Sequence, residues 1–253
     1  MDRWSGRVAV VTGASSGIGE AIAQQLVESG MIVVALARRE DRLKKLEEKM
    51  KGKKGKLHPL KTDITNMEDI KSALEWIDNK LGAIHVLINN AGIFINKKFQ
   101  ECEMEDIMKL FTVNVLSLGK LTKEVIGSME KHKIDLGHIF NISSIAGKIS
   151  HPFPQTMYYF ASKRAVDAIS EGLRMEIAVA KSKIKVSNVS PGLVMTELIE
   201  NAGFEHLTDE TPRLYPKDVA EGVVFALSTP PHMVVTELTL QPLGESIYSF
   251  INL

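Results

Sequence analysis

Short apolar runs alternate with longer stretches of helical periodicity along the whole chain of 253 residues, and this alternation limits the possible folds more than any other feature. The runs are rich in Val and Ile without polar alternation, as in strands covered on both faces of a parallel sheet. Strands are predicted at residues 8–12, 32–37, 57–61, 86–89, 138–143, 185–190 and 234–240. Helices are predicted at residues 18–29, 39–50, 67–81, 104–133, 159–180 and 217–228. The pattern predicts one α/β domain over residues 1–253, a doubly wound parallel sheet of about seven strands with helices on both faces.

One stretch, residues 195–215, breaks this rhythm. It lacks a clear strand or helix pattern and carries Thr211-Pro212-Arg213 near its end. Irregular stretches of this length inside a compact domain are typical of functional loops. We therefore expect residues 195–215 to form a short lid over a substrate site.

Composition excludes several classes of protein. Lys plus Arg and Asp plus Glu both number 31, so the formal net charge is zero and no nucleic-acid partner is expected. Cys102 is the single cysteine, which excludes an internal disulfide and a cysteine-based metal site. No apolar run has the length of a signal peptide core or a membrane span. We expect a soluble cytoplasmic protein with no membrane span and no bound metal.

The first predicted strand runs directly into a glycine-rich turn, Thr12-Gly13-Ala14-Ser15-Ser16-Gly17-Ile18-Gly19. In a doubly wound sheet this turn lies at the carboxyl edge, where the free N–H groups of a helix N-terminus bind phosphate. Glycine lets the backbone approach the phosphate and adopts positive φ angles. A tight turn without a ligand is the alternative, but the position at the first strand–helix junction favours a dinucleotide. The predicted cofactor contacts in this turn are Gly13, Ser15, Ser16, Gly17, Ile18 and Gly19.

Two arginines follow the second predicted strand. Arg38 and Arg39 stand where dinucleotide folds contact the adenosine ribose: an acidic residue there binds the 2′-hydroxyl, and an arginine accommodates a 2′-phosphate. The planar guanidinium suits bidentate binding of phosphate. The pair therefore predicts NADP(H) as the cofactor. We favour Arg38 as the phosphate contact, while the other arginine begins the solvated helix that follows.

Polar and small residues follow the next two strands. Asp63 and Ile64 come after the third strand, and the Asp63 carboxylate is suited either to accept a hydrogen bond from the adenine amino group or to cap the next helix. Asn90, Ala91 and Gly92 follow the fourth strand, where small residues let the backbone approach a cofactor. These five residues are predicted to line the cofactor site.

A tyrosine and a lysine stand four residues apart on one predicted helix. Tyr159 and Lys163 therefore project from the same helical face, although such spacing is also common on solvated helices. Two further features support a catalytic pair. Ser143 and Ser144 end the strand that precedes this helix, and Asn114 lies mid-helix between two valines, where packing does not explain a polar side chain.

Taken together, these motifs resemble those of the short-chain dehydrogenase/reductase (SDR) family, whose domain is of the Rossmann type. They run in family order over nearly the entire chain: Thr12-Gly13-x-x-x-Gly17-x-Gly19, Asn89-Asn90-Ala91-Gly92, Asn114, Ser144, Tyr159-x-x-x-Lys163 and Pro191-Gly192. Other stretches resemble the branch of insect farnesol dehydrogenases and vertebrate dehydrogenase/reductase SDR family member 11. They are Arg3-Trp4-x-Gly6-Arg7-Val8-Ala9, Ala35-x-Ala37-Arg38-Arg39, Gly137-His138-Ile139 and Leu227-Ser228-Thr229-Pro230.

The resemblance implies a role for each member of the catalytic set. Tyr159 would be the general acid/base for the alcohol or carbonyl oxygen, its pKa lowered from about 10 by Lys163 and the oxidised nicotinamide. Lys163 would also bind the nicotinamide ribose. Ser144 would donate a hydrogen bond to the substrate oxygen, and Asn114 would anchor a water that leads protons to Lys163.

Adjacent pairs leave two choices within this set. Ser144 is preferred to Ser143 because Ser144-Ile145-Ala146-Gly147 fits the family's Ser-x-x-Gly register. Tyr159 is preferred to Tyr158 because only Tyr159 has a lysine at the fourth position on. Tyr158 is expected to line the substrate pocket instead.

The resemblance also assigns the segment after the sixth strand to the nicotinamide. Pro191, Gly192, Val194 and Thr196 match the family's segment over the nicotinamide face. Pro-Gly alone would also be typical of a turn. Thr196 is expected either to bind the carboxamide or to cap the next helix.

Mostly apolar residues surround the expected substrate site, so we predict a small hydrophobic alcohol or carbonyl compound as the substrate. Besides Ser144, the predicted lining is Phe94, Phe153, Met157, Tyr158, Leu198, Ile199 and Phe204. Branch resemblance suggests farnesol or a related isoprenoid. A broad-specificity carbonyl or steroid reductase is the alternative, and a non-catalytic NADP(H)-binding sensor is a more remote one. Family resemblance implies a homodimer or homotetramer, formed through the helices at 104–133 and 159–180.

Overall fold

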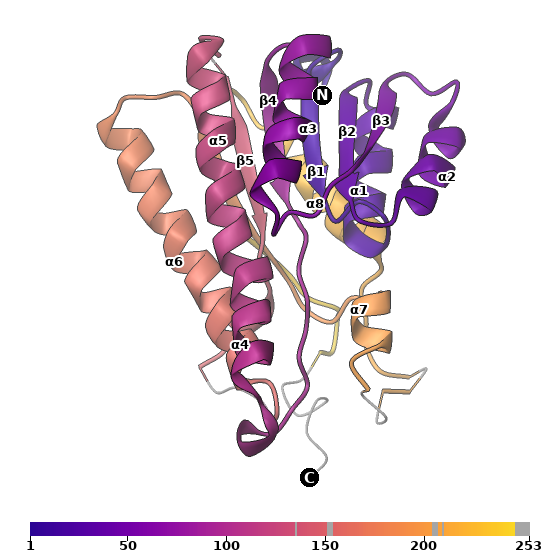
Figure 1. Cartoon of the computed structure of the whole chain (residues 1–253), viewed down its shortest axis with the longest axis vertical. Coiled ribbons are helices and arrows are strands. Elements are labelled where there is room, and N and C mark those ends of the chain that lie inside the picture. The colour runs from indigo at the N-terminus through magenta and orange to yellow at the C-terminus, as the bar shows by residue number, and fades with distance from the viewer. Residues whose placement is uncertain (135, 151–153, 204–206, 209, 246–253) are drawn as a thin grey trace.

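The computed structural model describes residues 1–134, 136–150, 154–203, 207–208 and 210–245. Within them, seven parallel strands form one sheet in the order β3-β2-β1-β4-β5-β6-β7 (Figure 1). The strands are β1 (Val8–Thr12), β2 (Ile32–Ala37), β3 (Lys56–Lys61), β4 (Ile84–Asn89), β5 (His138–Ile142), β6 (Lys185–Pro191) and β7 (Glu237–Leu240). The predicted single-domain, doubly wound α/β fold is confirmed.

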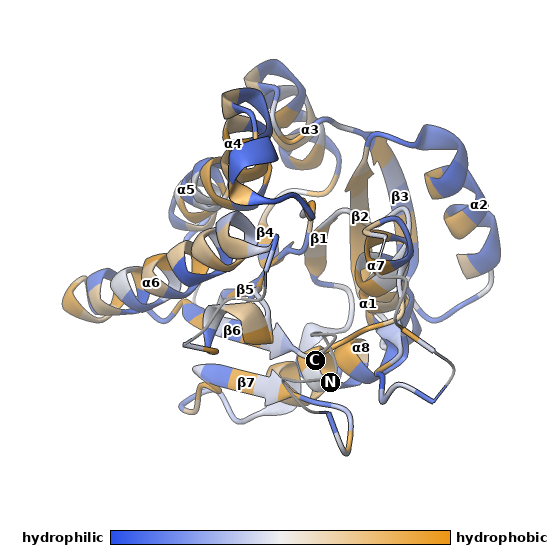
Figure 2. Ribbon diagram, turned by 90° about the horizontal axis from the view of Figure 1, so that it is seen from below, coloured by the Kyte–Doolittle hydropathy of each residue, from blue (hydrophilic) through white to orange (hydrophobic). Residues whose placement is uncertain are grey.

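Helices cover both faces of this sheet (Figure 2). They are α1 (Gly17–Glu28), α2 (Glu40–Met50), α3 (Met67–Lys80), α4 (Met104–Phe111), α5 (Ser117–Lys131), α6 (Met157–Val179), α7 (Glu197–Glu200) and α8 (Pro216–Ser228). Buried side chains of α1, α2 and α8 form one core with the sheet, and those of α3 and α5 form a second core on the opposite face, against which partly buried side chains of α6 pack. No described helix is both long and apolar enough to cross a membrane.

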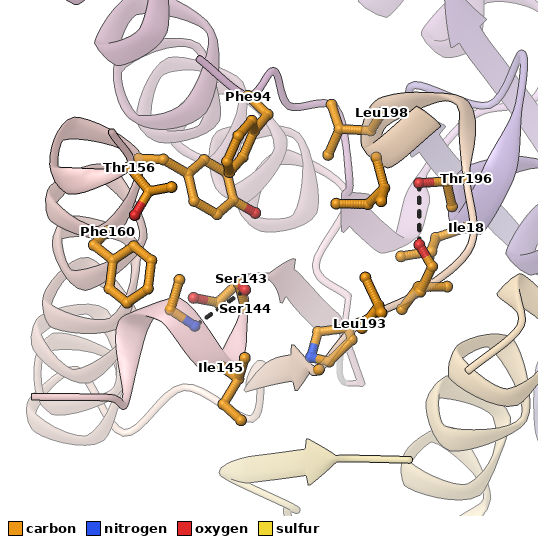
Figure 3. A pocket seen from close by; sticks show the side chains of 16 residues that line it. Ile18, Phe94, Ser143, Ser144, Ile145, Thr156, Phe160, Leu193, Thr196 and Leu198 are labelled. Carbon is orange, nitrogen blue, oxygen red and sulfur yellow. Dashed lines mark hydrogen bonds between the residues drawn. The ribbon is translucent and has the colours of Figure 1, made fainter. Parts of the chain in front are cut away.

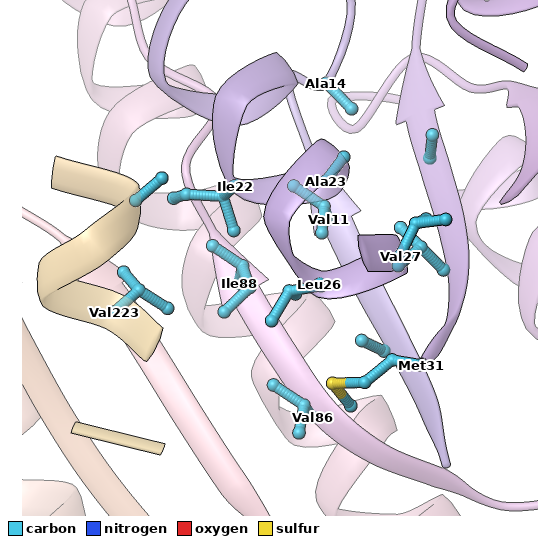
Figure 4. Close-up of a cluster of buried hydrophobic side chains, with 14 of the residues drawn as sticks. Val11, Ala14, Ile22, Ala23, Leu26, Val27, Met31, Val86, Ile88 and Val223 are labelled. Carbon is cyan, nitrogen blue, oxygen red and sulfur yellow. The ribbon is translucent and has the colours of Figure 1, made fainter. Parts of the chain in front are cut away.

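Successive residues of the strands supply the two cores alternately. Ala9 and Val11 of β1 pack in the core of α1 and α8, whereas Val8 and Val10 pack in the core of α3 and α5. This is the period of two that a strand imposes on its side chains. Figure 4 shows the first core, where α1 and α8 lie side by side against the sheet. Burial on both faces explains why the strand sequences are uniformly apolar.

All the strands are parallel, so their carboxyl ends meet at one edge of the sheet. Buried polar side chains join neighbouring strands there. Asn90, just after β4, donates from Nδ2 to the Thr12 carbonyl at the end of β1 over 2.9 Å. Asn89 Nδ2 donates to Asn141 Oδ1 of β5 over the same distance. These bonds hold the edge that carries the functional residues.

The helix predicted at 104–133 is not continuous. A π-helical turn, Thr112–Leu116, separates α4 from α5. Asn114 in this turn bonds both the N–H and the carbonyl of Ile93 (2.8 and 3.0 Å), and Ser117 Oγ donates to the Thr112 carbonyl (2.8 Å). Side-chain bonds to the backbone thus widen the helix locally, and π turns are frequent at functional sites.

The last strand is shorter than the predicted range of 234–240. The carbonyls of Met233 and Val235 accept hydrogen bonds from the side chains of Lys185 and Ser187, so they do not pair in the sheet. β7 therefore begins at Glu237.

Candidate active site

Two adjoining cavities lie at the carboxyl edge of the sheet among the described residues. The larger, of about 480 Å³, is a groove that crosses the ends of β1 to β5, and the smaller, of about 100 Å³, continues from it beneath α7. An extended dinucleotide requires the larger of the two. Of the predicted cofactor residues, the groove is lined by Gly13, Ser15, Ser16, Gly17, Ile18, Arg38, Arg39, Asp63, Ile64, Asn90, Ala91, Gly92, Tyr159, Lys163 and Thr196.

Two glycines shape the groove at the end of β1. Gly13 and Gly17 have φ angles of 65° and 58°, which residues other than glycine rarely adopt. A Cβ atom on Gly13 would lie 2.9 Å from the Ala91 Cα atom. Gly19, which is also predicted as a cofactor contact, is not among the residues that line the groove, and a Cβ there would meet Asn90 Nδ2 at 2.4 Å. The lack of a side chain lets Gly19 lie close to the Asn90 side chain and the Gly13 carbonyl.

The N-terminus of α1 fits a phosphate group. Ser16 precedes the helix but makes no side-chain capping bond, so the N–H groups of the first turn remain available. Arg39 adds positive charge there, since its guanidinium donates to Ser15 Oγ (3.0 Å) and Ser16 Oγ (2.6 Å). Free N–H donors beside a guanidinium form an anion site of the kind that pyrophosphate occupies in dinucleotide folds.

The two arginines after β2 differ in their partners. Arg39 also pairs with Glu197 of α7 (2.7 Å), and Arg42 reaches the same carboxylate. Arg38 forms no hydrogen bond or ion pair within the part of the chain that the structure describes, and it faces the groove. Its guanidinium is thus available to a ligand, whereas that of Arg39 is already engaged.

Asp63 does not cap the helix that follows it. Asn66 performs that role for α3, accepting the N–H of Glu68. The Asp63 carboxylate instead accepts the N–H and the hydroxyl of Thr65 (2.9 and 2.7 Å) and lines the groove. Burial raises its pKa, but the two Thr65 bonds and the charge of Arg38 outweigh burial and leave the pKa below its usual value.

Tyr159 and Lys163 project together from α6 into the base of the groove. Lys163 is only 6% exposed, its Nζ atom donates to the Ile142 carbonyl over 3.0 Å, and it lies 5.7 Å from the centre of the Tyr159 ring. Burial lowers the pKa of Lys163 to about 8, against the opposing charge of Asp167. Burial raises the pKa of Tyr159 to about 12, against a hydrogen bond with Ser144.

The predicted lowering of the Tyr159 pKa is therefore not a property of the polypeptide alone. Desolvation favours the uncharged form of each group and outweighs the local donors. A lowering of the Tyr159 pKa would have to come from the positive charge of the oxidised nicotinamide when the cofactor is bound.

The two adjacent serines point in different directions. Ser143 is buried and donates from Oγ to Asp167 Oδ1 over 2.6 Å. Ser144 lines the smaller cavity, and its Oγ atom accepts the N–H of Ala146 over 3.1 Å (Figure 3). The two side chains thus point apart, and the geometry supports Ser144 as the one that faces a substrate.

Asn114 is 2% exposed and lies close to Lys163. A Cβ atom on Gly92 would be 3.4 Å from Asn114 Oδ1 and 3.8 Å from Lys163 Nζ, so the glycine separates the two side chains. Asn114 Nδ2 also donates to Ser162 Oγ over 3.1 Å. The π turn therefore brings this amide into the same buried pocket as the lysine.

The segment after β6 lies over the other side of the site. Pro191, Gly192 and Val194 line the smaller cavity rather than the groove, and Thr196 lines both. Thr196 precedes α7 but makes no side-chain capping bond; its hydroxyl donates to the Val194 carbonyl over 3.4 Å. Its methyl group would touch a Cβ atom on Gly17 at 3.0 Å. The contact with the glycine-rich turn favours a cofactor role over capping.

The smaller cavity is mostly apolar, as predicted for a hydrophobic substrate. Of the predicted lining, Phe94, Ser144, Leu198 and Ile199 are present, with Phe94 and Leu198 across the cavity from Phe160 (Figure 3). The cavity is also lined by Ile18, Ser143, Ile145, Ala146, Thr156, Phe160 and Leu193. Phe153 and Phe204 lie outside the described residues.

Met157 and Tyr158, which are predicted for the substrate pocket, are not among the residues that line the smaller cavity. The helical period turns Tyr159 and Phe160 toward the cavity, so the two preceding residues face away. Met157 is 43% exposed, and Tyr158 stacks on Phe99 with ring centres 6.2 Å apart.

Two residues that were not predicted as site residues, Thr12 and Asp167, hold the site together through hydrogen bonds. Thr12 Oγ1 accepts the N–H groups of Asn90 and Ala91, each over 3.0 Å. Asp167, which accepts the Ser143 hydroxyl, stands four residues after Lys163 on α6. That helical spacing was a usable signal, because it places the carboxylate on the same face as the lysine.

Comparisons with known proteins agree with this geometry. The model of the short chain dehydrogenase family matches residues 7–206. Farnesol dehydrogenase of Aedes aegypti is 41% identical over 249 residues, which cover 97% of this chain and 99% of that protein. Dehydrogenase/reductase SDR family member 11 of Bos taurus is 38% identical over 254 residues, covering 96% and 98% respectively.

A solved structure supports the same assignment. The closed form of serine dehydrogenase complexed with NADP+ superposes with a TM-score of 0.84 at 28% identity, covering 97% of this chain and 98% of that one. Sequence motifs, sheet order, site geometry and both kinds of comparison therefore agree that this chain belongs to the short-chain dehydrogenase family, in the branch of farnesol dehydrogenase and family member 11.

Proposed function

We propose that this SDR oxidoreductase interconverts a hydrophobic alcohol and its carbonyl compound with NADP(H), and that Tyr159 is its general acid/base. The observation that carries the proposal is that Tyr159 lines both cavities, beside Ser144 in the apolar cavity and beside Lys163 in the groove. A non-catalytic sensor would not require this combination of groups at one point.

Each residue of the site has a defined task in the proposed reaction. The nicotinamide, when bound, accepts hydride from the alcohol carbon or supplies it to the carbonyl carbon. In the oxidation, the Tyr159 phenolate takes the hydroxyl proton of the alcohol, and in the reduction the phenol returns that proton to the carbonyl oxygen. Ser144 donates a hydrogen bond to the same oxygen, and the Lys163 ammonium stabilises the phenolate. Asn114 anchors the path of protons beside Lys163.

The cofactor assignment rests on the two ends of the groove. The uncapped N-terminus of α1 suits the pyrophosphate, and the guanidinium of Arg38, which has no partner among the described residues, suits a 2′-phosphate. Serine dehydrogenase, the structural neighbour described above, is complexed with NADP+. We propose NADP(H) on these grounds, with Pro191, Gly192, Val194 and Thr196 against the nicotinamide.

The substrate assignment rests on the apolar cavity and on the relatives. Phe94, Leu198 and Ile199 give it a hydrophobic wall. One relative is named farnesol dehydrogenase, which supports farnesol or a related isoprenoid as the substrate. A broad-specificity carbonyl or steroid reductase is the second candidate. The lid at 195–215 and the cytoplasmic location stay predictions.

Replacing Tyr159 by Phe tests the general acid/base. The variant keeps the ring but loses the hydroxyl, so we expect kcat to fall by about 10²- to 10⁴-fold while NADPH still binds. Turnover is followed at the absorbance of reduced nicotinamide, and binding by quenching of protein fluorescence. The neighbouring change Tyr158→Phe is the matched control and should leave kcat unaltered. Unchanged turnover in Tyr159→Phe would remove the proposed role.

Replacing Arg38 by Asp tests the choice of cofactor. The change removes a donor and places a negative charge near the 2′-phosphate, so the Kd for NADPH should rise about 10- to 100-fold while that for NADH stays level or falls. Fluorescence titration with both nucleotides measures this. Arg39→Asp is the comparison variant. A larger loss of NADPH affinity in Arg39→Asp would assign the phosphate contact to Arg39. NADPH binding as tight as in the wild type by both variants would argue against NADP(H) selection at this position.

A substrate panel separates the two candidate activities. We expect kcat/KM for farnesol and similar isoprenoid alcohols to exceed that for steroids and small dicarbonyls by about tenfold or more, because each extra buried methylene adds binding in an apolar cavity. The Tyr159→Phe protein gives the background rate for every compound. Highest kcat/KM with dicarbonyls or steroids would instead support the broad reductase.

We also propose self-association through α4, α5 and α6. Exposed apolar side chains lie on this side of the sheet, namely Met104, Met108, Leu116, Met175 and Val179. The far end of α6 extends beyond the neighbouring helices (Figures 1 and 2). Burial of such side chains against a second copy would be favourable.

Sedimentation equilibrium tests the association. The chain should sediment as a dimer or tetramer, and the double change Met108→Glu, Met175→Glu should shift it toward monomer. Phe225→Glu, an exposed apolar position on α8 across the sheet, is the control and should still self-associate. A monomeric wild-type protein would contradict the proposal.

A further inference from the structure

A buried carboxylate lies one helical turn beyond Lys163. Asp167 follows the lysine by four residues on α6, so both side chains leave the same face of the helix. Their exposed fractions are 8% and 6%. Because a carboxylate is unfavourable in the interior unless it is paired, the partners of Asp167 indicate why it is there.

Asp167 has partners on three other segments. Its Oδ1 atom accepts the Ser143 hydroxyl at the end of β5 (2.6 Å) and the Asn188 amide of β6 (2.7 Å). Lys148 Nζ, from the loop after Ser144, lies 2.9 Å from Oδ2. A Cβ atom on Gly147 would be 2.5 Å from Oδ2, so this loop wraps closely around the carboxylate.

Two side chains on the same face of α6 thus bind two consecutive residues at the end of β5. Lys163 binds the Ile142 carbonyl, and Asp167 binds the Ser143 side chain. Ser144, whose hydroxyl meets that of Tyr159, is the next residue. The carboxylate therefore fixes the backbone on which Ser144 depends.

Other charged groups surround Asp167 at greater exposure. Lys148 also pairs with Glu237 at the start of β7 (2.9 Å), and Glu237 pairs with Arg174 of α6 (3.0 Å). The side chains of these three residues are 18% to 33% exposed. Water screens them more than it screens Asp167 and Lys163, which are both buried, since the effective dielectric constant is lower in the interior.

We propose that Asp167 is a positioning residue for the reaction: its carboxylate holds Ser143, and through it Ser144, while its negative charge keeps Lys163 protonated beside Tyr159. The inference rests on the proposed function, in which the Lys163 ammonium stabilises the phenolate. Burial lowers the pKa of Lys163 to about 8, and the charge of Asp167 opposes that fall. Without the carboxylate, the lysine would lose its proton at lower pH.

Direct titration of Lys163 tests the electrostatic part. In protein labelled with ¹³C at lysine Cε, the resonance of Lys163 is assigned from Lys163→Met and followed with pH in the ligand-free protein. The change Asp167→Asn keeps the shape and the acceptor atom but removes the charge. We expect its Lys163 pKa to lie lower than in the wild type by on the order of one unit. Equal pKa values in the two proteins overturn the proposal.

Glu237→Gln is the matched control. It removes an anion from the outer end of the same network, without touching Ser143 or Lys163. The Lys163 pKa should then equal that of the wild type. A shift as large as in Asp167→Asn would mean that any nearby anion suffices, which overturns a specific role for Asp167.

The pH dependence of turnover tests the link to catalysis. Since the ammonium form acts, kcat for NADPH-linked reduction falls as pH rises through the Lys163 pKa. In Asp167→Asn this alkaline limb should move to lower pH, with a roughly tenfold lower rate above the wild-type limb. A shifted resonance with an unmoved limb overturns the positioning role. If Tyr159→Phe keeps full turnover, it is the proposed function that fails, and the resonance shift distinguishes the two failures.

A second variant covers the case in which Asp167→Asn does not fold. Lys148→Gln removes the partly exposed cation beside Asp167 Oδ2. Because this cation no longer offsets the negative charge of Asp167, the carboxylate should stabilise the Lys163 ammonium more strongly. The Lys163 resonance should then titrate at higher pH than in the wild type. An unchanged or lower value overturns the proposal.

Discussion

Desolvation at the base of the groove is the constraint on which the site depends. Removing water favours the uncharged form of both Tyr159 and Lys163, and their pKa values move to about 12 and about 8. The proposed chemistry needs the opposite pair, a phenolate and an ammonium. Neighbours must therefore oppose burial, and three do so: the Ser144 hydroxyl, the Ile142 carbonyl and the Asp167 carboxylate. Burial in turn makes each of these contacts stronger than it would be in water.

The parallel sheet makes this arrangement possible without long loops. Because every strand ends at the same edge, residues far apart in sequence meet there after only a few residues of connection. Side-chain bonds from Asn89 and Asn90 to neighbouring strands then fix the relative positions of those ends. A rigid edge holds donors in place before a substrate arrives, which is where most electrostatic catalysis originates.

Local spacing explains what could be predicted from the sequence. The period of the helix brings Tyr159 and Lys163 together, and the backbone of a tight turn requires glycine at Gly13 and Gly17. Such features depend on a few consecutive residues, so they can be recognised without knowledge of the rest of the chain. The fold class follows for the same reason, because the apolar pattern of each strand reflects burial on both faces.

Non-local contacts explain what could not be predicted. Helix α6 begins at Met157 rather than at the predicted Tyr159, so Tyr158 packs on Phe99 outside the cavity. The π turn at Asn114 depends on the backbone of Ile93, twenty-one positions away in sequence. The attachment of residues 195–215 is likewise non-local. Its base is held by backbone bonds to Leu214, while its α7 end is tied by the exposed ion pair of Glu197 with Arg39, a kind that contributes only about 0–1 kcal/mol. Since a phosphate would compete for the same guanidinium, a bound phosphate would weaken this ion pair.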